Sequence, residues 1–365
     1  MRIDRDAMRA RLRAALVALA TSIVPFVAAC GGSGGTSAAP PAPTSPATQP
    51  PATQPPPTPA PGQSYVYYST ENSNPSTVQI GAIRYPVTNA SVPAVAVTSS
   101  NLNQLGSVGQ MQVDSSGRLF AAGFGIQQTV FVFETLPLSS SSIPFPLYLP
   151  AGVSGPDPAI AFDSAGNLWV SANGAGIYEF KAPFPGPAIL SPSITLKAGG
   201  CAFPVGLAFD RAGNLWVACG NSAGANSVAE FLKGAGFSSS TPIDHYLNGP
   251  VRPFALIFDG AGDLYVGSQH AAPTGGIALY KSTNLAAGAT PDVYNATGQL
   301  SSVPFPFQLA FDPAGNLYDA DCSSPARLYV YPTAAHAFSS SLAPSAVYTD
   351  ANINAAACTA GVAIH

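Results

Sequence analysis

The chain has 365 residues, of which 47% are hydrophobic and only 9% are charged, with 35 glycines and 37 prolines. This apolar fraction excludes a wholly disordered protein, and the length suffices for one large core or two smaller ones. Lysine and arginine number 14 against 18 aspartates and glutamates, and five of the arginines precede residue 14. Because nucleic-acid binding needs a dense basic surface against the phosphates, we expect no nucleic-acid partner.

The first thirty residues are typical of a secretory signal. An arginine-rich start precedes the apolar run 14–29, which is too short to span a bilayer comfortably. The run ends in the letters VAAC, whose cysteine is Cys30. This ending resembles the lipobox of bacterial lipoproteins, although valine stands where leucine is usual. The resemblance implies acylation of Cys30, palmitate included, and anchoring to the lipid bilayer. An ordinary cleaved signal with an incidental cysteine is the alternative.

Gly31, rather than an aspartate, follows Cys30, a pattern typical of lipoproteins sent to the outer membrane. We therefore expect a lipid-anchored protein of the bacterial cell envelope. Residues 1–29 are the predicted signal peptide. Residues 30–63 are rich in Pro, Ala, Thr, Ser and Gly, which predicts a disordered tether because nothing in them can form a core. Residues 64–365 are the predicted folded domain.

One short motif recurs five times after residue 64. It reads apolar, Asp, two variable residues, Gly, a polar residue, Leu and an aromatic residue. Its aspartates are Asp114, Asp163, Asp210, Asp259 and Asp312. The carboxylate can accept hydrogen bonds from turn amides and the glycine permits a positive φ, so the motif predicts a β-hairpin. We interpret these aspartates as turn formers, and the aromatics as packing between neighbouring repeats. Those aromatics are Phe120, Trp169, Trp216, Tyr265 and Tyr318.

Further apolar stretches complete each repeat of about 50 residues. A third strand is predicted at 130–133, 177–180, 227–231, 277–280 and 328–331, and a weaker fourth at positions such as 146–149 and 345–348. Four short antiparallel strands per repeat are typical of a propeller blade. Residues 360–365 resemble a first strand, and 65–68 with 78–85 resemble a second and a third. We therefore predict an all-β, six-bladed β-propeller of four-stranded antiparallel blades, closed by terminal strands that share one blade.

With this repeat, residues 64–365 resemble six-bladed propellers of the NHL-repeat type and, more loosely, the gluconolactonase and regucalcin-like proteins. The motif is specific for the architecture and not for one activity. In the lactonase-like proteins a divalent metal at the channel mouth is held by carboxylate and amide oxygens. The resemblance therefore implies Ca²⁺ or Mg²⁺ as the cofactor of such a site.

The mouth is where predicted second strands end and first strands begin, and the repeat no longer constrains the sequence there. Oxygen-bearing candidates for a metal at this place are Asp157, Asn173, Asn221 and Asp321. His270 and Arg252 are candidates for acid-base chemistry and for holding an anion. Because no matched glutamate occupies the first-strand positions, our first interpretation is polar loop residues at a water-filled channel, with the metal site as the alternative.

The cysteines predict a disulfide framework. Setting Cys30 aside leaves four, an even number in a secreted protein, with three possible pairings. Cys201 opens a predicted first strand and Cys219 closes the second strand of the same blade. Cys322 and Cys358 take the corresponding places in adjacent blades. We predict the bridges Cys201–Cys219 and Cys322–Cys358, the latter stapling the closing blade. A cysteine-rich metal site is disfavoured, since no Cys-x-x-Cys spacing occurs.

The leading interpretation is a membrane-anchored, extracytoplasmic, monomeric propeller that acts as a binding or scaffolding module. Its ligand would be a protein, a glycan or a small molecule. The alternative from another class is a metal-dependent hydrolase of the lactonase or esterase type with its site at the channel mouth. A lyase-like NHL propeller is a third reading, supported by the fold alone. On balance the residues favour a protein without catalytic activity.

Overall fold

The computed structural model describes residues 64–71, 78–98, 108–123, 129–150, 153, 158–172, 176–201, 203–222, 225–270, 275–297, 299, 303–356 and 358–365. The predicted signal peptide and tether, with Cys30, lie outside the described residues. Among the residues that are described, no helix has the length and apolar character needed to cross a membrane.

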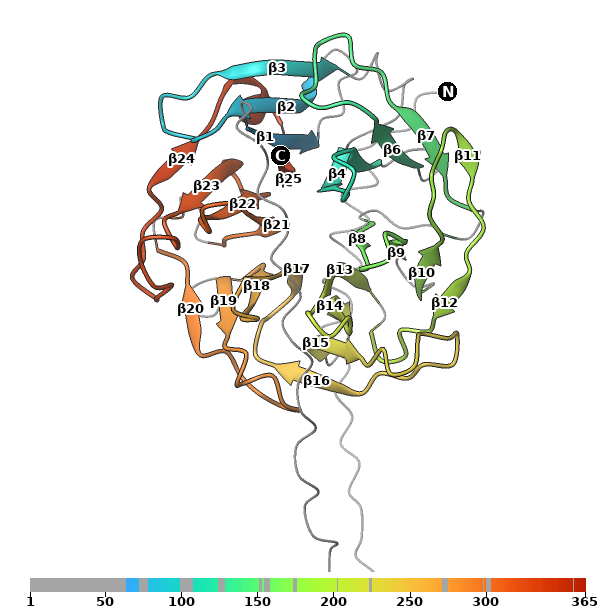
Figure 1. The fold of residues 1–365 in the computed structure, drawn as a ribbon. Coiled ribbons are helices and arrows are strands. Elements are labelled where there is room, and N and C mark those ends of the chain that lie inside the picture. The colour runs from blue at the N-terminus through green and yellow to red at the C-terminus, as the bar shows by residue number, and fades with distance from the viewer. Residues whose placement is uncertain are drawn as a thin grey trace, which may run out of the picture. The chain divides into compact units, whose positions relative to one another are not determined.

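The described strands form six sheets that are arranged around a common axis as the blades of a propeller (Figure 1). In each blade the first strand lies innermost and the fourth lies at the rim (Figure 1). We number the blades 1 to 5 along the chain and call the sixth the closing blade, because it contains strands from both ends of the described chain. The predicted all-β, six-bladed architecture is confirmed.

Blades 1 to 3 have the following strands. Blade 1 contains β4 (Val108–Val113), β5 (Leu119–Gly123), β6 (Thr129–Phe133) and β7 (Phe145–Tyr148). Blade 2 contains β8 (Ile160–Phe162), β9 (Leu168–Ala172), β10 (Gly176–Phe180) and β12 (Ile194–Leu196). Blade 3 contains β13 (Pro204–Phe209), β14 (Leu215–Ser222), β15 (Ala225–Phe231) and β16 (His245–Asn248).

The remaining blades repeat the pattern. Blade 4 contains β17 (Pro253–Phe258), β18 (Leu264–Ser268), β19 (Gly276–Tyr280) and β20 (Val293–Asn295). Blade 5 contains β21 (Pro306–Phe311), β22 (Leu317–Asp321), β23 (Arg327–Tyr331) and β24 (Ala346–Tyr348). The closing blade contains β25 (Cys358–Ile364), β1 (Tyr65–Glu71), β2 (Val78–Arg84) and β3 (Pro93–Thr98), and the helix α2 (Ala351–Ala355) precedes β25.

The repeated aspartates form the hairpin turns between first and second strands. In blade 2, Oδ1 of Asp163 accepts hydrogen bonds of 2.9 Å from the backbone N–H groups of Ala165 and Asn167. Gly166 has a φ of +80°, which a residue with a side chain adopts only with strain. The prediction that these aspartates are turn formers is confirmed. We call the side of the ring that carries these turns the turn face, and the opposite side the mouth face.

The motif aromatics pack between blades. The ring of Trp169 in blade 2 lies edge-on to Phe209 and Phe237 of blade 3, with ring centroids 5.7 and 5.1 Å away. Phe120 meets Phe162 of the next blade at 4.8 Å in the same geometry. Such contacts recur around the ring and bury large apolar surfaces, which is the main driving force for stacking blades. The sequence-based interpretation of these residues is confirmed.

Neighbouring blades are also joined at the rim, a feature that the sequence pattern did not predict. Strand β11 (Ala188–Ile189) belongs to the loop before β12 of blade 2, yet it pairs in parallel with β7 of blade 1. Between blades 3 and 4, the backbone N–H of Asn248 donates to the carbonyl oxygen of Ala289 at 2.8 Å. In both places the outer loop of one blade therefore covers the outer strand of the preceding blade.

The ring is closed by the two ends of the described chain. Strand β1 pairs antiparallel with β25, placing Val66 opposite Ile364, and the C-terminus lies beside these strands (Figure 1). Tyr65 and His365 exchange two backbone hydrogen bonds of 2.8 and 3.0 Å. The predicted shared blade is confirmed, and β1 is paired on both sides, with β25 and with β2.

Two buried glutamines lie between the innermost strands. Gln110 of β4 donates from Nε2 to the carbonyl oxygens of Val205 and Phe307, which belong to blades 3 and 5, at 3.2 and 3.4 Å. Gln308 of β21 bonds to both backbone groups of Met111 and accepts from the N–H of Val362. Blades 1, 3 and 5 are not neighbours in the ring, so side chains can join them only near the axis. At this level the axis holds two amide side chains.

Candidate functional site

Both predicted disulfides are present on the mouth face. Cys201 is bonded to Cys219 with a Cα–Cα distance of 5.1 Å, and Cys322 to Cys358 with a distance of 4.1 Å. The first bridge joins the end of β14 to the segment that enters β13 of the same blade. The second joins blade 5 to the closing blade. Disulfides persist in oxidising compartments, so these bridges favour a location outside the cytoplasm.

Asp321, one of the four predicted metal ligands, is engaged within its own blade. One carboxylate oxygen accepts hydrogen bonds from the backbone N–H and the hydroxyl of Ser323, and the other accepts from the N–H of Phe305 at 3.0 Å. The side chain is fully buried. Burial raises the pKa of Asp321, although these hydrogen bonds act in the opposite direction. The carboxylate is thus already occupied in holding the chain at the mouth face.

The position that Asp321 occupies ties the end of the second strand to the segment that enters the first strand. In three blades a different side chain makes this tie. Asp321, Ser268 and Cys219 each lie opposite the proline that begins the first strand of their blade. Asp321 bonds to the entering segment through its carboxylate, Ser268 through a hydroxyl that donates to the carbonyl oxygen of Val251 at 2.6 Å, and Cys219 through the disulfide. The variety at this position therefore reflects alternative ties between strands.

The other predicted oxygen ligands are not tested. Asp157 and Asn173 lie outside the described residues. The backbone of Asn221 belongs to β14, but its side chain lies outside the described part. Asp321 is consequently the only one of the four whose side-chain contacts the structure describes. These contacts are hydrogen bonds from Ser323 and from the backbone N–H of Phe305.

His270 and Arg252 lie on the mouth face of blade 4. The backbone N–H of Gln269 donates to the carbonyl oxygen of Arg252 at 3.1 Å, which places the two candidates on adjoining segments. Arg252 has a φ of +53°, which is unusual for a residue other than glycine. Burial lowers the pKa of its guanidinium from the usual value, but arginine keeps its charge in proteins. Arg252 therefore adds a positive charge to the mouth face.

A fully buried carboxylate, Asp319, lies two residues before Asp321 on β22. Its Oδ2 accepts a hydrogen bond of 3.1 Å from Gln299, which also donates to the hydroxyl of Tyr331 at 3.1 Å. Its Oδ1 has no hydrogen-bond partner among the described residues. Burial, followed by the nearby charge of Asp321, raises the pKa of Asp319 well above the usual value. Its burial between blades 4 and 5 therefore disfavours the charged form of this carboxyl group.

A surface hollow lies at the rim of the closing blade, around the turn that follows β2. Its lining includes Arg84, Tyr85, Pro86 and Val92, and Arg84 is the one charged group among its lining residues. A single arginine at an open surface provides no catalytic pair and no metal ligand set. We therefore assign no site to this hollow.

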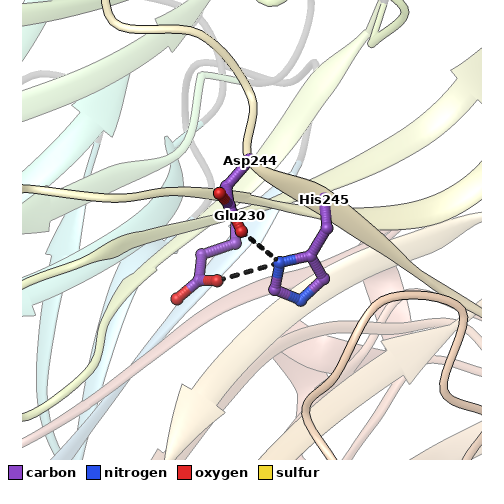
Figure 2. Close-up of side chains that lie close together, drawn as sticks. All are labelled: Glu230, Asp244 and His245. Atoms are coloured by element: carbon purple, nitrogen blue, oxygen red, sulfur yellow. Dashed lines mark hydrogen bonds and ion pairs between the residues drawn. The ribbon is translucent and has the colours of Figure 1, made fainter. Parts of the chain in front are cut away.

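The densest group of metal-ligand side chains among the described residues is formed by Glu230, Asp244 and His245 of blade 3 (Figure 2). It lies on the turn face, because Glu230 pairs with Trp216 beside the hairpin turn that joins β13 to β14. Nδ1 of His245 lies 2.8 Å from Oδ2 of Asp244 and 3.1 Å from Oε2 of Glu230. The antiparallel pairing of β15 and β16 sets Glu230 directly opposite His245. The edge of the Trp216 ring meets the imidazole with centroids 5.6 Å apart. We call these three residues the Glu230 cluster.

The second nitrogen of the imidazole bonds to a different blade. Nε2 of His245 lies 2.8 Å from the carbonyl oxygen of Leu285, in the loop between β19 and β20 of blade 4. Both nitrogens face acceptors, so a proton on each of them would satisfy both contacts. Burial opposes that charge, but the hydrogen bonds to Asp244 and Leu285 and the negative charges of the cluster outweigh it and raise the pKa of His245. Burial raises the pKa of Glu230 as well.

Blade 2 has a glutamate at the same place and compensates it differently. Glu179 accepts from Nζ of Lys181 at 2.6 Å and from the hydroxyl of Ser193 at 2.6 Å. The backbone N–H of Ser193 donates to the carbonyl of Glu179 exactly as Asp244 does to Glu230, both at 2.8 Å. Blade 3 therefore replaces the serine by an aspartate, and Leu232 stands two residues after the glutamate, where blade 2 has its lysine.

The Glu230 cluster was not among the sites predicted from the sequence. Only the glutamate could have been recognised from the sequence, because a glutamate stands at the next-to-last position of the third strand in two blades. Asp244 and His245 follow a long loop, so their register opposite Glu230 could not be read from the pattern.

Comparison with known proteins supports the fold only. No model of a known protein family matches the chain, and no curated protein has a significantly similar sequence. A provisional 6-phosphogluconolactonase from Bacteroides uniformis is 15% identical, with 83% of this chain and 99% of that one covered and a TM-score of 0.50. At this identity the likeness shows a shared propeller fold and no shared activity.

Two further structures are similar at lower scores. A protein of unknown function from Bacteroides caccae is 10% identical over 83% of this chain and 99% of its own, with a TM-score of 0.49. The periplasmic gluconolactonase PpgL of Pseudomonas aeruginosa is 13% identical over 78% of this chain and 98% of its own, with a TM-score of 0.48.

Proposed function

We propose that this chain is a lipid-anchored, extracytoplasmic propeller that acts as a binding or scaffolding module and presents its mouth face to a partner. The observation that carries the proposal is the pair of disulfides on that face. They rigidify strand ends at the mouth and are suited to an oxidising compartment. The VAAC sequence at Cys30 supplies the proposed anchor.

The contrast between the two faces supports the choice of the mouth. All five hairpin turns of the turn face have the same aspartate motif, whereas the segments at the mouth differ from blade to blade. Binding residues commonly lie in variable segments held by a rigid scaffold. The exposed Val303, which precedes β21, is one apolar side chain that this face offers.

The anchor is tested by cell fractionation and palmitate labelling of the full chain. The wild type is expected in the membrane fraction with label, and a Cys30→Ala variant in the soluble extracytoplasmic fraction without it. If the variant stays with the membranes, the anchor is wrong.

The binding role is tested by photo-crosslinking in cells. A benzophenone amino acid reacts with C–H bonds of any organic neighbour, so it detects proteins and glycans alike. Placed at Val303 on the mouth face, it should give an adduct. Placed at the exposed Ala165 in a hairpin turn, it should give none. Adducts at Ala165 alone, or at neither position, would contradict presentation of the mouth face.

The hydrolase alternative has no described contact in its favour, because Asp321 is bonded to backbone and Ser323. A direct assay separates it from the binding role. The purified chain is incubated with glucono-δ-lactone in the presence of Ca²⁺ or of chelator. We expect no chelator-sensitive hydrolysis, and turnover that chelation abolishes would favour the enzyme instead.

A further inference from the structure

The Glu230 cluster has the atoms of a three-ligand metal site. Its carboxylate oxygens and imidazole nitrogen lie within 4.8 Å of one another. In a tetrahedral zinc site, with bonds of about 2.0–2.1 Å, neighbouring ligand atoms lie about 3.3 Å apart. The distances of 2.8 and 3.1 Å from Nδ1 to the two carboxylates are slightly shorter. Opening these two distances by roughly 0.2–0.5 Å would give them the spacing of ligand atoms around a zinc ion, with the cation in place of the proton.

The hydrogen bond from His245 to blade 4 is independent of the carboxylates and orients the imidazole for a metal. Histidines that bind metals almost always donate their other ring N–H to a carbonyl or a carboxylate, which fixes the tautomer. Nε2 of His245 has such a partner in the carbonyl oxygen of Leu285, 2.8 Å away. The lone pair of Nδ1 in that tautomer points between Asp244 and Glu230 (Figure 2).

The comparison with blade 2 shows that blade 3 has no lysine at the corresponding place. There a lysine neutralises Glu179. In blade 3 two carboxylates are present, and among the described residues their only ion-pair partner is His245. With a neutral imidazole the cluster has a charge of about −2, and Glu230 is nearly buried, so its charge is poorly solvated. A divalent cation supplies the balancing charge that Lys181 supplies in the neighbouring blade.

From these observations we propose that Glu230, Asp244 and His245 bind a divalent transition-metal cation of the Zn²⁺ class. Imidazole with carboxylates suits Zn²⁺, whereas Ca²⁺ and Mg²⁺ prefer oxygen ligands alone. The side chain of Asp244 is 44% exposed, so a fourth coordination position opens to solvent. The cation would hold β15 to β16 and, through His245 and Leu285, fasten blade 3 to blade 4.

The test is isothermal titration of ZnCl₂ into the purified full chain, with Co²⁺ absorption as a report on tetrahedral coordination. We expect one Zn²⁺ per chain and a higher thermal unfolding temperature when it is bound. Asp244→Asn and His245→Gln should each weaken binding at least tenfold. Asp244 is partly exposed, so its variant should fold normally even if the His245 variant is less stable.

Matched controls come from the same chain. Glu230→Gln should abolish the titration signal, whereas Glu179→Gln, at the equivalent position of blade 2, should leave the affinity within twofold. His336→Gln, which removes an exposed histidine, should also leave it unchanged. The proposal is overturned if the wild type binds no Zn²⁺, if either Asp244→Asn or His245→Gln retains wild-type affinity, or if Mg²⁺ binds more tightly than Zn²⁺.

Discussion

Replacement of Gln308 by leucine tests whether the amides at the axis hold the ring together. In the wild type, Oε1 of Gln308 accepts from the backbone N–H groups of Met111 and Val362 at 2.9 and 3.0 Å, and Nε2 donates to the carbonyl oxygen of Met111 at 2.6 Å. These groups belong to blade 1 and the closing blade. Leucine has a similar volume, so the change removes the bonds without a large cavity.

The magnitude follows from the groups left behind. A buried donor or acceptor without a partner costs about 1–3 kcal/mol. Three such groups in Gln308→Leu give an expected loss of about 3–9 kcal/mol in the free energy of unfolding. Gln110→Leu is the matched control. Its two bonds are longer, at 3.2 and 3.4 Å, and end on carbonyl oxygens only, so we expect a loss of about 1–2 kcal/mol.

The assay is unfolding in urea followed by tryptophan fluorescence. Both Trp169 and Trp216 are buried between blades, so their emission reports loss of packing in the ring. The order of midpoints should be wild type, then Gln110→Leu, then Gln308→Leu. If Gln308→Leu lowers stability by less than 1 kcal/mol, or by less than Gln110→Leu does, the axis bonds do not hold the blades as we argue.

Three other changes test separate parts of the fold. Removing the bridge that closes the ring, with Cys322→Ala and Cys358→Ala together, frees a segment of 36 residues and should cost about 3–4 kcal/mol in urea unfolding; a loss below 1 kcal/mol would contradict this. Gly166→Ala should lower the free energy of unfolding by about 1–2 kcal/mol, because Gly166 has a φ of +80°. Gly186→Ala, where an added Cβ also meets no nearby atoms, should change it hardly at all. Equal losses in urea unfolding would show that the positive φ of Gly166 is not the cause. Asp319 has a raised pKa, so the folded protein binds its proton more tightly than the unfolded chain does. Stability should therefore fall as the pH rises from about 4 through the folded pKa. Asp319→Asn should flatten this dependence in thermal melts and stabilise the protein at neutral pH, and an unchanged pH profile would show that Asp319 is ionised.

The candidate site was only partly accessible to prediction. The second-strand end at Asp321 was correctly recognised as a place where the repeat varies, but its variation ties strands within the blade. The Glu230 cluster combines a strand end with the start of a strand beyond a long loop, and its bond to Leu285 comes from another blade. Neither the pairing of Glu230 with His245 nor the bond from His245 to Leu285 recurs at a fixed spacing along the chain. A periodic pattern in the sequence therefore could not predict these contacts.

The sequence by itself determined the blades, the turns and the closure of the ring. These features depend on short-range chemistry repeated every 50 residues or so, such as Asp163 bonding to amides two and four residues ahead. The disulfides followed because antiparallel pairing brings strand ends together. Only the tertiary structure decided how blades contact one another at the rim and the axis. Those contacts, from β11 to Gln308, depend on the twist and the packing distance of adjacent sheets, which side chains far apart in the chain set jointly.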